Sequence, residues 1–277
     1  MSRYPVDGFQ LFRYATLMLV AGVVIVPLSA TLLGGFKSLG ELRVDPFGLP
    51  SDWRFEYYWD ILSGGRLWEL LWNSLVIAFF TVFLTLATAA MAGFVLAHIR
   101  FFGNRFLMGY FLIGLMFPAA TAIIPLFIKV RDLGLLDTYW GVILPQVAFA
   151  LGFSILLFRS FFRQLPHELF EAAFIDGCGY MRFFWHVTIP LSRPILATVG
   201  IFALVQSWNN FLLPLVVLNS DGSFPWPLGI MQFRGEYSSD WNKVLAFVTL
   251  TIAPAIVFFL AAQRYIVAGL TGGAVKG

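Results

Sequence analysis

Apolar residues gather in six long runs along this chain, and polar residues are largely confined to the segments between them. The runs cover about residues 14–33, 73–97, 106–128, 140–158, 195–218 and 244–262. About 20 apolar residues are needed to cross the roughly 30 Å of hydrocarbon in a bilayer. Because the bilayer core holds no water to satisfy backbone groups, each run is expected to be helical. The pattern predicts an all-α membrane protein with six transmembrane helices in a single domain, residues 1–277.

The composition agrees with this pattern, since 59% of the residues are hydrophobic and only 12% are charged. A soluble domain typically carries about 25% charged residues, so a soluble fold with a large core is excluded. The first apolar run is longer than the apolar part of a typical signal peptide, and no convincing cleavage site follows it. It is therefore predicted to remain as the first span.

Charge predicts the orientation of the spans, because basic residues collect in short cytoplasmic loops. Six spans place both termini on one side, together with the loops near residues 98–105 and 159–194. The second loop, HIRFFGNR, contains basic residues and no acidic residue. This side holds Arg3, Arg13, Arg100, Arg105, Arg159, Arg163, Arg182, Arg193, Arg264 and Lys276, against Asp7, Glu168, Glu171 and Asp176. Both termini are therefore predicted to lie in the cytoplasm of a plasma (cell inner) membrane protein.

Several kinds of catalytic or energy-coupling motif are missing from the sequence. No span centre carries an ionisable residue, which argues against a proton-coupled carrier or an intramembrane hydrolase. There is no GxxxxGK[ST] phosphate loop and no HExxH or CxxC pattern. The histidines His98, His167 and His186 are scattered, and the single cysteine, Cys178, excludes an internal disulfide. We expect a non-catalytic pore subunit that binds no cofactor or metal itself and takes its energy from a partner.

Two longer polar segments are predicted on the outer side. In the first, 36–72, the apolar residues Phe55, Tyr58, Trp59 and Leu62 fall on one helical face, which predicts a short helix near the membrane surface. The second, 219–243, is rich in Gly, Pro and Ser, and Trp226, Phe233 and Trp241 are its candidate anchors. A docking loop for an external partner and a passive connection remain equally open for this segment.

The segment 166–194 has mixed polarity and lies between the fourth and fifth runs. Pro166 suits the first position of a helix that runs from His167 to Ile175. Asp176 and Gly177 should end this helix, and a second helix is predicted from Tyr180 to Ile189, before Pro190. The spacing alone fits either a hairpin resting on lipid headgroups or a rigid element that docks on a soluble subunit.

The residues EAAFIDG followed by VTIP resemble the EAA loop of ABC importer permeases. Ile189 replaces the usual Leu before the proline, and Cys178 stands where a small Ala is common. The ending QRYIVAGLTGGAVKG, together with Asn73-Ser74-Leu75 and Trp208-Asn209, is similar to maltose-type carbohydrate permeases. The resemblance covers essentially the whole chain.

This resemblance implies the type I importer permease fold, with a first helix that wraps a partner and a cytoplasmic coupling helix. It implies a pore subunit that imports a sugar or oligosaccharide delivered by an extracytoplasmic binding protein. The implied partners are a cytosolic ATPase dimer, which binds ATP and Mg, and a second permease that is a different chain. The residues assigned to ATPase coupling are Glu168, Glu171, Ala172, Ala173, Asp176, Gly177, Phe183 and Pro190.

Neutral polar residues inside the spans are the candidates for the substrate path, because sugars bind through neutral hydrogen bonds and ring stacking. The residues assigned to the substrate path are Gln206, Trp208, Asn209, Asn210 and Thr85. Thr81 and Thr88 form a stripe with Thr85 along the second span. Such residues more often form hydrogen bonds between neighbouring helices. A stand-alone secondary carrier and an intramembrane enzyme are the alternatives to an importer subunit.

Overall fold

The computed structural model describes residues 8–233, 235 and 239–271, most of which lie in helices. No β-strand occurs in these residues. The chain divides into two units, Met1–Trp68 with Gly229–Pro254 and Glu69–Leu228 with Ala255–Gly277. Each unit is described by itself.

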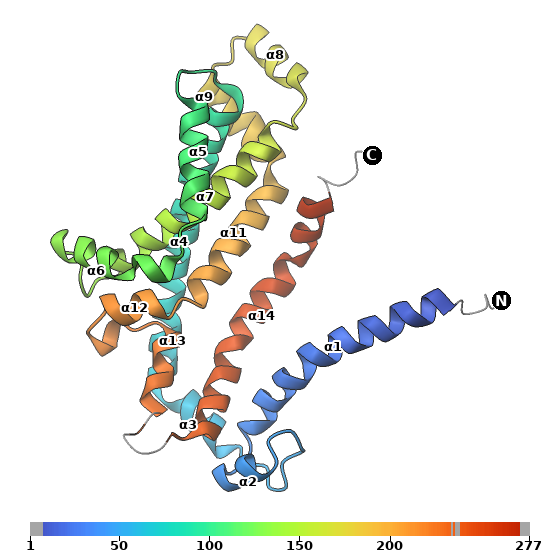
Figure 1. Ribbon diagram of the computed structural model, residues 1–277, viewed down its shortest axis with the longest axis vertical. Helices are drawn as coiled ribbons and strands as arrows, with labels where there is room; N and C mark the ends of the chain where they lie inside the picture. Colours follow the sequence, from blue (N-terminus) through green and yellow to red (C-terminus); the bar gives the residue numbers. More distant parts are fainter. Residues whose placement is uncertain (1–7, 234, 236–238, 272–277) are drawn as a thin grey trace. The chain divides into compact units, whose positions relative to one another are not determined.

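The first unit contains α1 (Gly8–Gly34), α2 (Leu39–Val44), α3 (Glu56–Ser63) and the first part of α14 (Trp241–Thr271) (Figure 1). The helix predicted around Tyr58 and Trp59 is confirmed as α3. The Tyr58 hydroxyl donates to the Leu32 carbonyl over 2.7 Å and so ties α3 to the end of α1. Most side chains from Gln10 to Leu28 of α1 are exposed.

The second unit contains most of α4 (Gly65–His98), then α5 (Asn104–Leu115), η1 (Ala119–Ala122), α6 (Ile123–Asp132) and α7 (Tyr139–Phe162). The hairpin of α8 (His167–Ile175) and α9 (Tyr180–Phe183) follows. The chain then passes through the π-helical turn η2 (Phe184–Thr188) and α10 (Ile189–Leu191) into α11 (Arg193–Trp208). It continues through α12 (Leu212–Val217), η3 (Asp221–Ser223), α13 (Trp226–Gly229) and η4 (Ile230–Phe233), the last of which belongs to the first unit.

Four helices in the described residues are long and apolar enough to cross a membrane, or six if each of two bent pairs is one span. The predicted runs 14–33, 73–97, 140–158 and 244–262 lie inside α1, α4, α7 and α14. The predicted span 106–128 is not one straight helix, because α5 and the segment Ala119–Asp132 meet at 92°, and it remains a span only if this bent pair crosses the membrane together. Pro118 lies in the break between them, with the extended backbone that precedes η1.

The predicted continuous helix 195–218 is also wrong. Helix α11 ends at Trp208, and α12 starts at Leu212. Phe211 is the N-cap of α12, and the Oδ1 of the preceding Asn210 accepts a hydrogen bond from the Leu213 N–H over 3.2 Å, which satisfies a donor in the first turn of α12. The whole apolar run is therefore two helices joined by a short turn.

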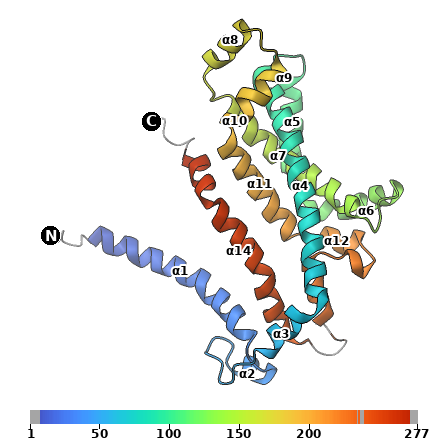
Figure 2. The same ribbon diagram turned by 180° about the vertical axis from the view of Figure 1, so that it is seen from behind.

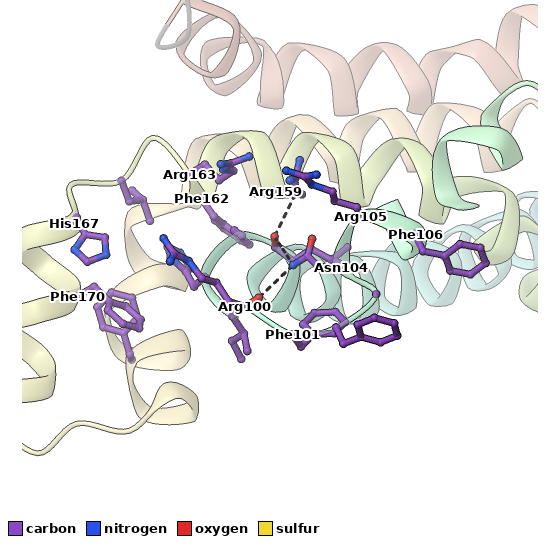
Figure 3. A pocket seen from close by; sticks show the side chains of 18 of the residues that line it. Arg100, Phe101, Asn104, Arg105, Phe106, Arg159, Phe162, Arg163, His167 and Phe170 are labelled. Atoms are coloured by element: carbon purple, nitrogen blue, oxygen red, sulfur yellow. Dashed lines mark hydrogen bonds between the residues drawn. The ribbon is translucent and has the colours of Figure 1, made fainter. Parts of the chain in front are cut away.

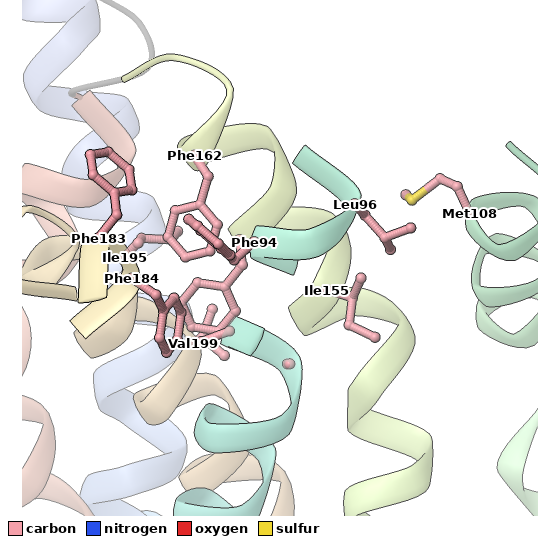
Figure 4. Close-up of a cluster of buried hydrophobic side chains, with 12 residues drawn as sticks. Phe94, Leu96, Met108, Ile155, Phe162, Phe183, Phe184, Ile195 and Val199 are labelled. Carbon is pink, nitrogen blue, oxygen red and sulfur yellow. The ribbon is translucent and has the colours of Figure 1, made fainter. Parts of the chain in front are cut away.

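Two apolar clusters hold the second unit together. One joins α4, α6, α7 and α12 through Ile77, Val130, Val142, Ile143, Val147, Leu213 and Val217, with Leu218. The other joins the ends of α4 and α7 with α5, α9, η2 and α11 (Figure 4). Helices α4 and α7 approach closely at Gly93, where an added Cβ would lie only 2.7 Å from the Cβ of Phe158.

The loop between α6 and α7 is clamped to the segment that follows α12. The Asp137 Oδ1 accepts hydrogen bonds from the Asn219 and Ser220 N–H groups at 2.9 Å each, and Oδ2 accepts one from the Ser220 hydroxyl. The Ser220 hydroxyl, followed by the two N–H groups, lowers the pKa of Asp137 below its ordinary value. A lowered folded-state pKa adds stability above the unfolded pKa and loses it as the pH falls through the folded pKa.

Replacing Asp137 with alanine is expected to lower the thermal unfolding temperature of the purified protein at pH 7, and Asp137→Asn to lower it less. Asn keeps an oxygen acceptor and tolerates the positive φ of 58° at this position. Since both the folded and the unfolded pKa lie below pH 5, the difference between the wild type and either variant should stay constant from pH 8 to pH 5. Equal unfolding temperatures for wild type and Asp137→Ala would contradict a stabilising clamp.

Candidate coupling site and substrate path

Helix α8 begins and ends with recognisable caps. Pro166 is the N-cap residue and not the first helical residue as predicted, with its extended ψ of 131° directing the chain into His167. At the other end, the N–H of Gly177 donates to Phe174 O and the N–H of Cys178 donates to Ala173 O. This pair of bonds, with Gly177 at a φ of 76°, is a Schellman motif. The predicted break at Asp176 and Gly177 is confirmed, and the turn has one defined geometry.

The inner face of α8 packs on aromatic rings from other helices. Phe170 stacks on the His98 ring at the end of α4, with ring centroids 5.5 Å apart and an angle of 12°. Phe170 also meets Phe183 edge-on at 5.0 Å, and Phe183 lies 6.3 Å from Phe94 of α4. Aromatic pairs in these arrangements add stability beyond the apolar area they bury. The hairpin is thus joined to a membrane helix by side-chain packing.

The face of α8 that points away from α4 is exposed and carries both acidic and apolar side chains. Glu168, Glu171, Ala172 and Ile175 follow the i, i+3, i+4, i+7 spacing of one helical face, and all are exposed. Ile175 has 86% of its surface exposed. Glu171 Oε1 lies 3.1 Å from His167 Nδ1, an exposed pair one turn apart. The small Ala172 lies at the centre of this face, which leaves room for an apposed surface.

The residues assigned to ATPase coupling occupy different places in the hairpin. Glu168, Glu171, Ala172 and Asp176 are exposed, whereas Ala173 is half-buried. Phe183 is only 2% exposed, so it cannot be a contact surface and instead holds the hairpin against α4. Gly177 is exposed and sets the turn, and Pro190 is exposed beyond it.

The predicted second helix, Tyr180 to Ile189, is too short. The helical backbone continues through η2 and α10 to Leu191 and then bends by 79° into α11. Pro190 does not stop the helix, because the wider π-helical turn before it relieves the clash between a proline ring and the preceding turn. Thr188 and Ser192 are fully buried at the bend, where the Ser192 hydroxyl donates to Thr188 O over 2.6 Å.

The residues assigned to the substrate path do not form one surface. Gln206 and Asn209 are exposed, but Trp208 is only 4% exposed and Thr85 is fully buried. Asn210 lies beyond the end of α11, and its Oδ1 accepts a hydrogen bond from the first turn of α12, so it does not lie on one helical face with Gln206 and Asn209. A small cavity of about 90 Å³ lies beside Trp208 and Asn209, with Phe258 and Phe259 of α14 among its lining residues.

A buried hydrogen-bonded group that the sequence did not identify links three helices. Gln146 Oε1 of α7 accepts from Ser207 Oγ over 2.6 Å and from Thr81 Oγ1 over 3.2 Å. The Thr81 hydroxyl therefore forms a hydrogen bond between helices and does not line a substrate path. Such bonding between helices was the alternative role for the threonines of α4. No sequence pattern links Gln146 to Ser207, which lies about 60 residues away.

Trp226 anchors part of the second outer segment. Its backbone N–H donates to Ser74 Oγ over 2.8 Å, and its Nε1 donates to Trp208 O over 2.7 Å. Asn73 Nδ2 donates to Gly222 O and Phe224 O. The Asn73-Ser74 pair noted in the sequence thus fixes residues 222–226. Residues 234 and 236–238 of the same segment, and 272–277 of the C-terminal ending, lie outside the described residues.

Comparison with known proteins identifies the family. The sequence matches the family described as binding-protein-dependent transport system inner membrane component over residues 86–272. It is 38% identical over 272 residues to the diacetylchitobiose uptake system permease protein NgcG of Streptomyces coelicolor, covering 97% of this chain and 89% of that protein. It is 33% identical to the arabinooligosaccharides transport system permease protein AraQ of Bacillus subtilis (97% and 98%). It is 35% identical to the trehalose transport system permease protein SugB of Mycobacterium tuberculosis (94% and 95%).

Solved structures agree on the fold. A bacterial ABC transporter that imports the acidic polysaccharide alginate aligns with a TM-score of 0.83 and 24% identity, covering 96% of this chain and 100% of that chain. The inward-facing MetNI methionine ABC transporter aligns with a TM-score of 0.58 and 17% identity over 76% of this chain and 96% of that chain. At these identities the likeness shows the fold alone, and it confirms the predicted all-α importer permease fold. The chain therefore belongs to the binding-protein-dependent transport system inner membrane components, the permease subunits of ABC importers, and is a transmembrane transport subunit and not an enzyme.

Proposed function

We propose that this chain is one of two pore subunits of an ATP-driven importer of oligosaccharides, and that the exposed face of α8 docks on a cytosolic ATPase. The observation that carries the proposal is the division of α8 into two faces. One face packs against α4 through Phe170 and Phe183. The opposite face exposes Glu168, Glu171 and Ala172. A helix held in this way moves with the membrane helices, so closure of an ATPase dimer bound to it would be transmitted to the pore.

The substrate class is inferred from the relatives, whose names specify diacetylchitobiose, arabinooligosaccharides and trehalose. The exposed amide side chains of Gln206 and Asn209 suit neutral hydroxyl groups, and the absence of charge there suits an uncharged sugar. The buried Nε1–H of Trp208 has no hydrogen-bond partner in the described residues. An unpaired buried donor costs about 1–3 kcal/mol, which supports a partner for Trp208 in another state of transport. We therefore propose Gln206, Trp208 and Asn209 as path residues, whereas Thr85 is fully buried and Asn210 is engaged by the first turn of α12.

The other subunits follow from the same proposal. The ATPase dimer binds ATP and Mg, a binding protein delivers the sugar from outside, and a second, different permease completes the pore. The exposed apolar surface of α1, including Leu11, Phe12 and Met18, suits a helix that wraps this second permease. Docking on a cytosolic ATPase requires α8 and both termini to lie in the cytoplasm, as the distribution of arginine predicts.

Replacing Glu171 with lysine is expected to abolish co-purification of the ATPase with the tagged chain. Glu171 is exposed and lies on the presented face of α8, so the fold should tolerate the change while the charge of the docking face is reversed. The measurement is the amount of ATPase retained per permease after affinity purification from membranes.

The control is Glu56→Lys, which makes the same charge change on an exposed residue of α3. It should leave ATPase retention unchanged. Retention that is equal in the two variants would argue against docking through α8. Sugar uptake by the purified chain alone in liposomes, driven by an ion gradient, would instead favour a secondary carrier.

A further inference from the structure

A cleft of about 1230 Å³ lies between the α4–α5 turn, the end of α7 and the start of the α8–α9 hairpin (Figure 3). Its lining belongs entirely to the second unit and includes Arg100, Arg105, Arg159 and Arg163. The volume exceeds the roughly 300–1,000 Å³ of an ordinary small-molecule pocket. The cleft therefore has room for a bulky ligand.

The charge of the lining has a single sign. It holds four arginines and no acidic residue, and Glu171, one turn beyond the lining residue His167, is paired with that histidine. No ion pair in the described residues involves any of the four arginines. Four guanidinium groups in one cleft repel one another, and an anion that bridges them would remove this repulsion.

Part of this arrangement is held in place by hydrogen bonds. The Arg159 Nε donates to Leu96 O over 3.2 Å, and the Asn104 side-chain amide donates to the same carbonyl over 3.3 Å (Figure 3). These bonds satisfy a carbonyl in the last turn of α4 and leave the terminal nitrogens of Arg159 unused. Arg163 follows Arg159 by one helical turn, so both project from the same face of α7.

The cleft lies where apolar helices end. Its walls come from the last turn of α4, the first turn of α5, the end of α7, and His167, Phe170 and Phe183 of the hairpin. Since α4 and α7 are long and apolar enough to span a membrane, their ends are expected near the boundary of the hydrocarbon region. Its rim carries Phe102, which is fully exposed, and Phe106, which is 75% exposed. Aromatic side chains at this depth contact the first part of lipid acyl chains.

We propose that this cleft binds the headgroup of an anionic phospholipid, with its phosphodiester among the arginines and its acyl chains along Phe102 and Phe106. Basic pockets between membrane helices suit such headgroups. Free inorganic phosphate shares the anionic chemistry, but it would make no use of the exposed rings on the rim. The proposal does not depend on the proposed transport function.

The test compares lipid binding to the full chain, purified in mild detergent with the subunits that accompany it. Bound lipid is counted by native mass spectrometry during titration with palmitoyl-oleoyl phosphatidylglycerol or palmitoyl-oleoyl phosphatidylcholine. The cleft variant is Arg100→Gln with Arg163→Gln, which leaves Arg159 in place because it caps α4. The matched control is Arg182→Gln with Arg193→Gln, which removes two exposed arginines of the same unit outside the cleft.

Wild type and control are expected to bind phosphatidylglycerol with the same affinity, and the cleft variant about tenfold more weakly. Phosphatidylcholine should bind weakly to all three proteins. Equal loss in the control variant, or equal binding of the two lipids, would show general surface attraction and overturn the proposal. Displacement of the lipid by millimolar inorganic phosphate would assign the cleft to a free anion. A cleft variant that keeps the lipid but loses its ATPase would assign it to an acidic segment of that subunit.

Discussion

Replacing Gly177 with proline is expected to abolish ATP-driven uptake by the reconstituted importer, while the protein still inserts into the membrane. Gly177 has a φ of 76°, and its N–H donates to Phe174 O over 3.0 Å. Proline fixes φ near −65° and has no N–H, so the Schellman turn between α8 and α9 cannot form. Docking would then have to use a different, less favourable turn, and a penalty of about 3 kcal/mol corresponds to a loss of about 100-fold in ATPase affinity.

Matched substitutions at Gly177 separate turn geometry from other effects. No atom lies within 4 Å of a Cβ added at Gly177, so steric clashes with neighbours do not contribute. Asparagine tolerates positive φ and should retain most ATPase, whereas alanine should weaken docking by about 1–2 kcal/mol. The expected order of ATPase retention and uptake is Gly, Asn, Ala, Pro. Similar behaviour of the Asn and Pro variants would rule out the turn as the determinant.

The sequence predicted the features of this chain that depend on local chemistry. Apolar run length located α1, α4, α7 and α14, because the requirement for internal hydrogen bonding in lipid makes long apolar runs helical. The helix from His167 to Ile175 and its end at Gly177 followed from the residues themselves. The family followed from the EAA residues and was confirmed by the comparison.

The sequence failed where tertiary contacts decide the structure. The run 195–218 is an exception, because the hydrogen bond that Asn210 Oδ1 accepts from the Leu213 N–H is local, and apolar run length alone did not predict the break there. The inner face of α8 is determined by His98 and Phe94, which lie more than 70 residues away in sequence. Thr85 was predicted to line the substrate path, but it is fully buried in the core. Helical spacing alone does not show which face of a helix its neighbours cover.

Replacing Phe183 with alanine should have the largest effect on stability of any single change in the hairpin. The ring is 2% exposed and belongs to the buried cluster in Figure 4. Its centroid lies 5.0 Å from that of Phe170 and 6.3 Å from those of Phe94 and His98. Truncation of a buried Phe costs about 3–5 kcal/mol through lost burial and the cavity left behind. The variant should unfold at a markedly lower temperature in detergent. Trp185→Ala removes a larger but 54% exposed ring from the same segment and should change the unfolding temperature little.

A double-mutant cycle with Phe170 then tests whether Phe183 connects α8 to α4. If the two rings stabilise each other, the effects of Phe170→Ala and Phe183→Ala on the free energy of unfolding will not add. The expected coupling is about 0.5–1.5 kcal/mol, as for other edge-on aromatic pairs. In the ATPase-bound complex, either variant should also uncouple ATP hydrolysis from sugar uptake, because α8 would remain docked without moving α4. Additive effects on stability together with intact coupling would show that the hairpin transmits force by another route, such as the covalent path through η2 and α10 into α11.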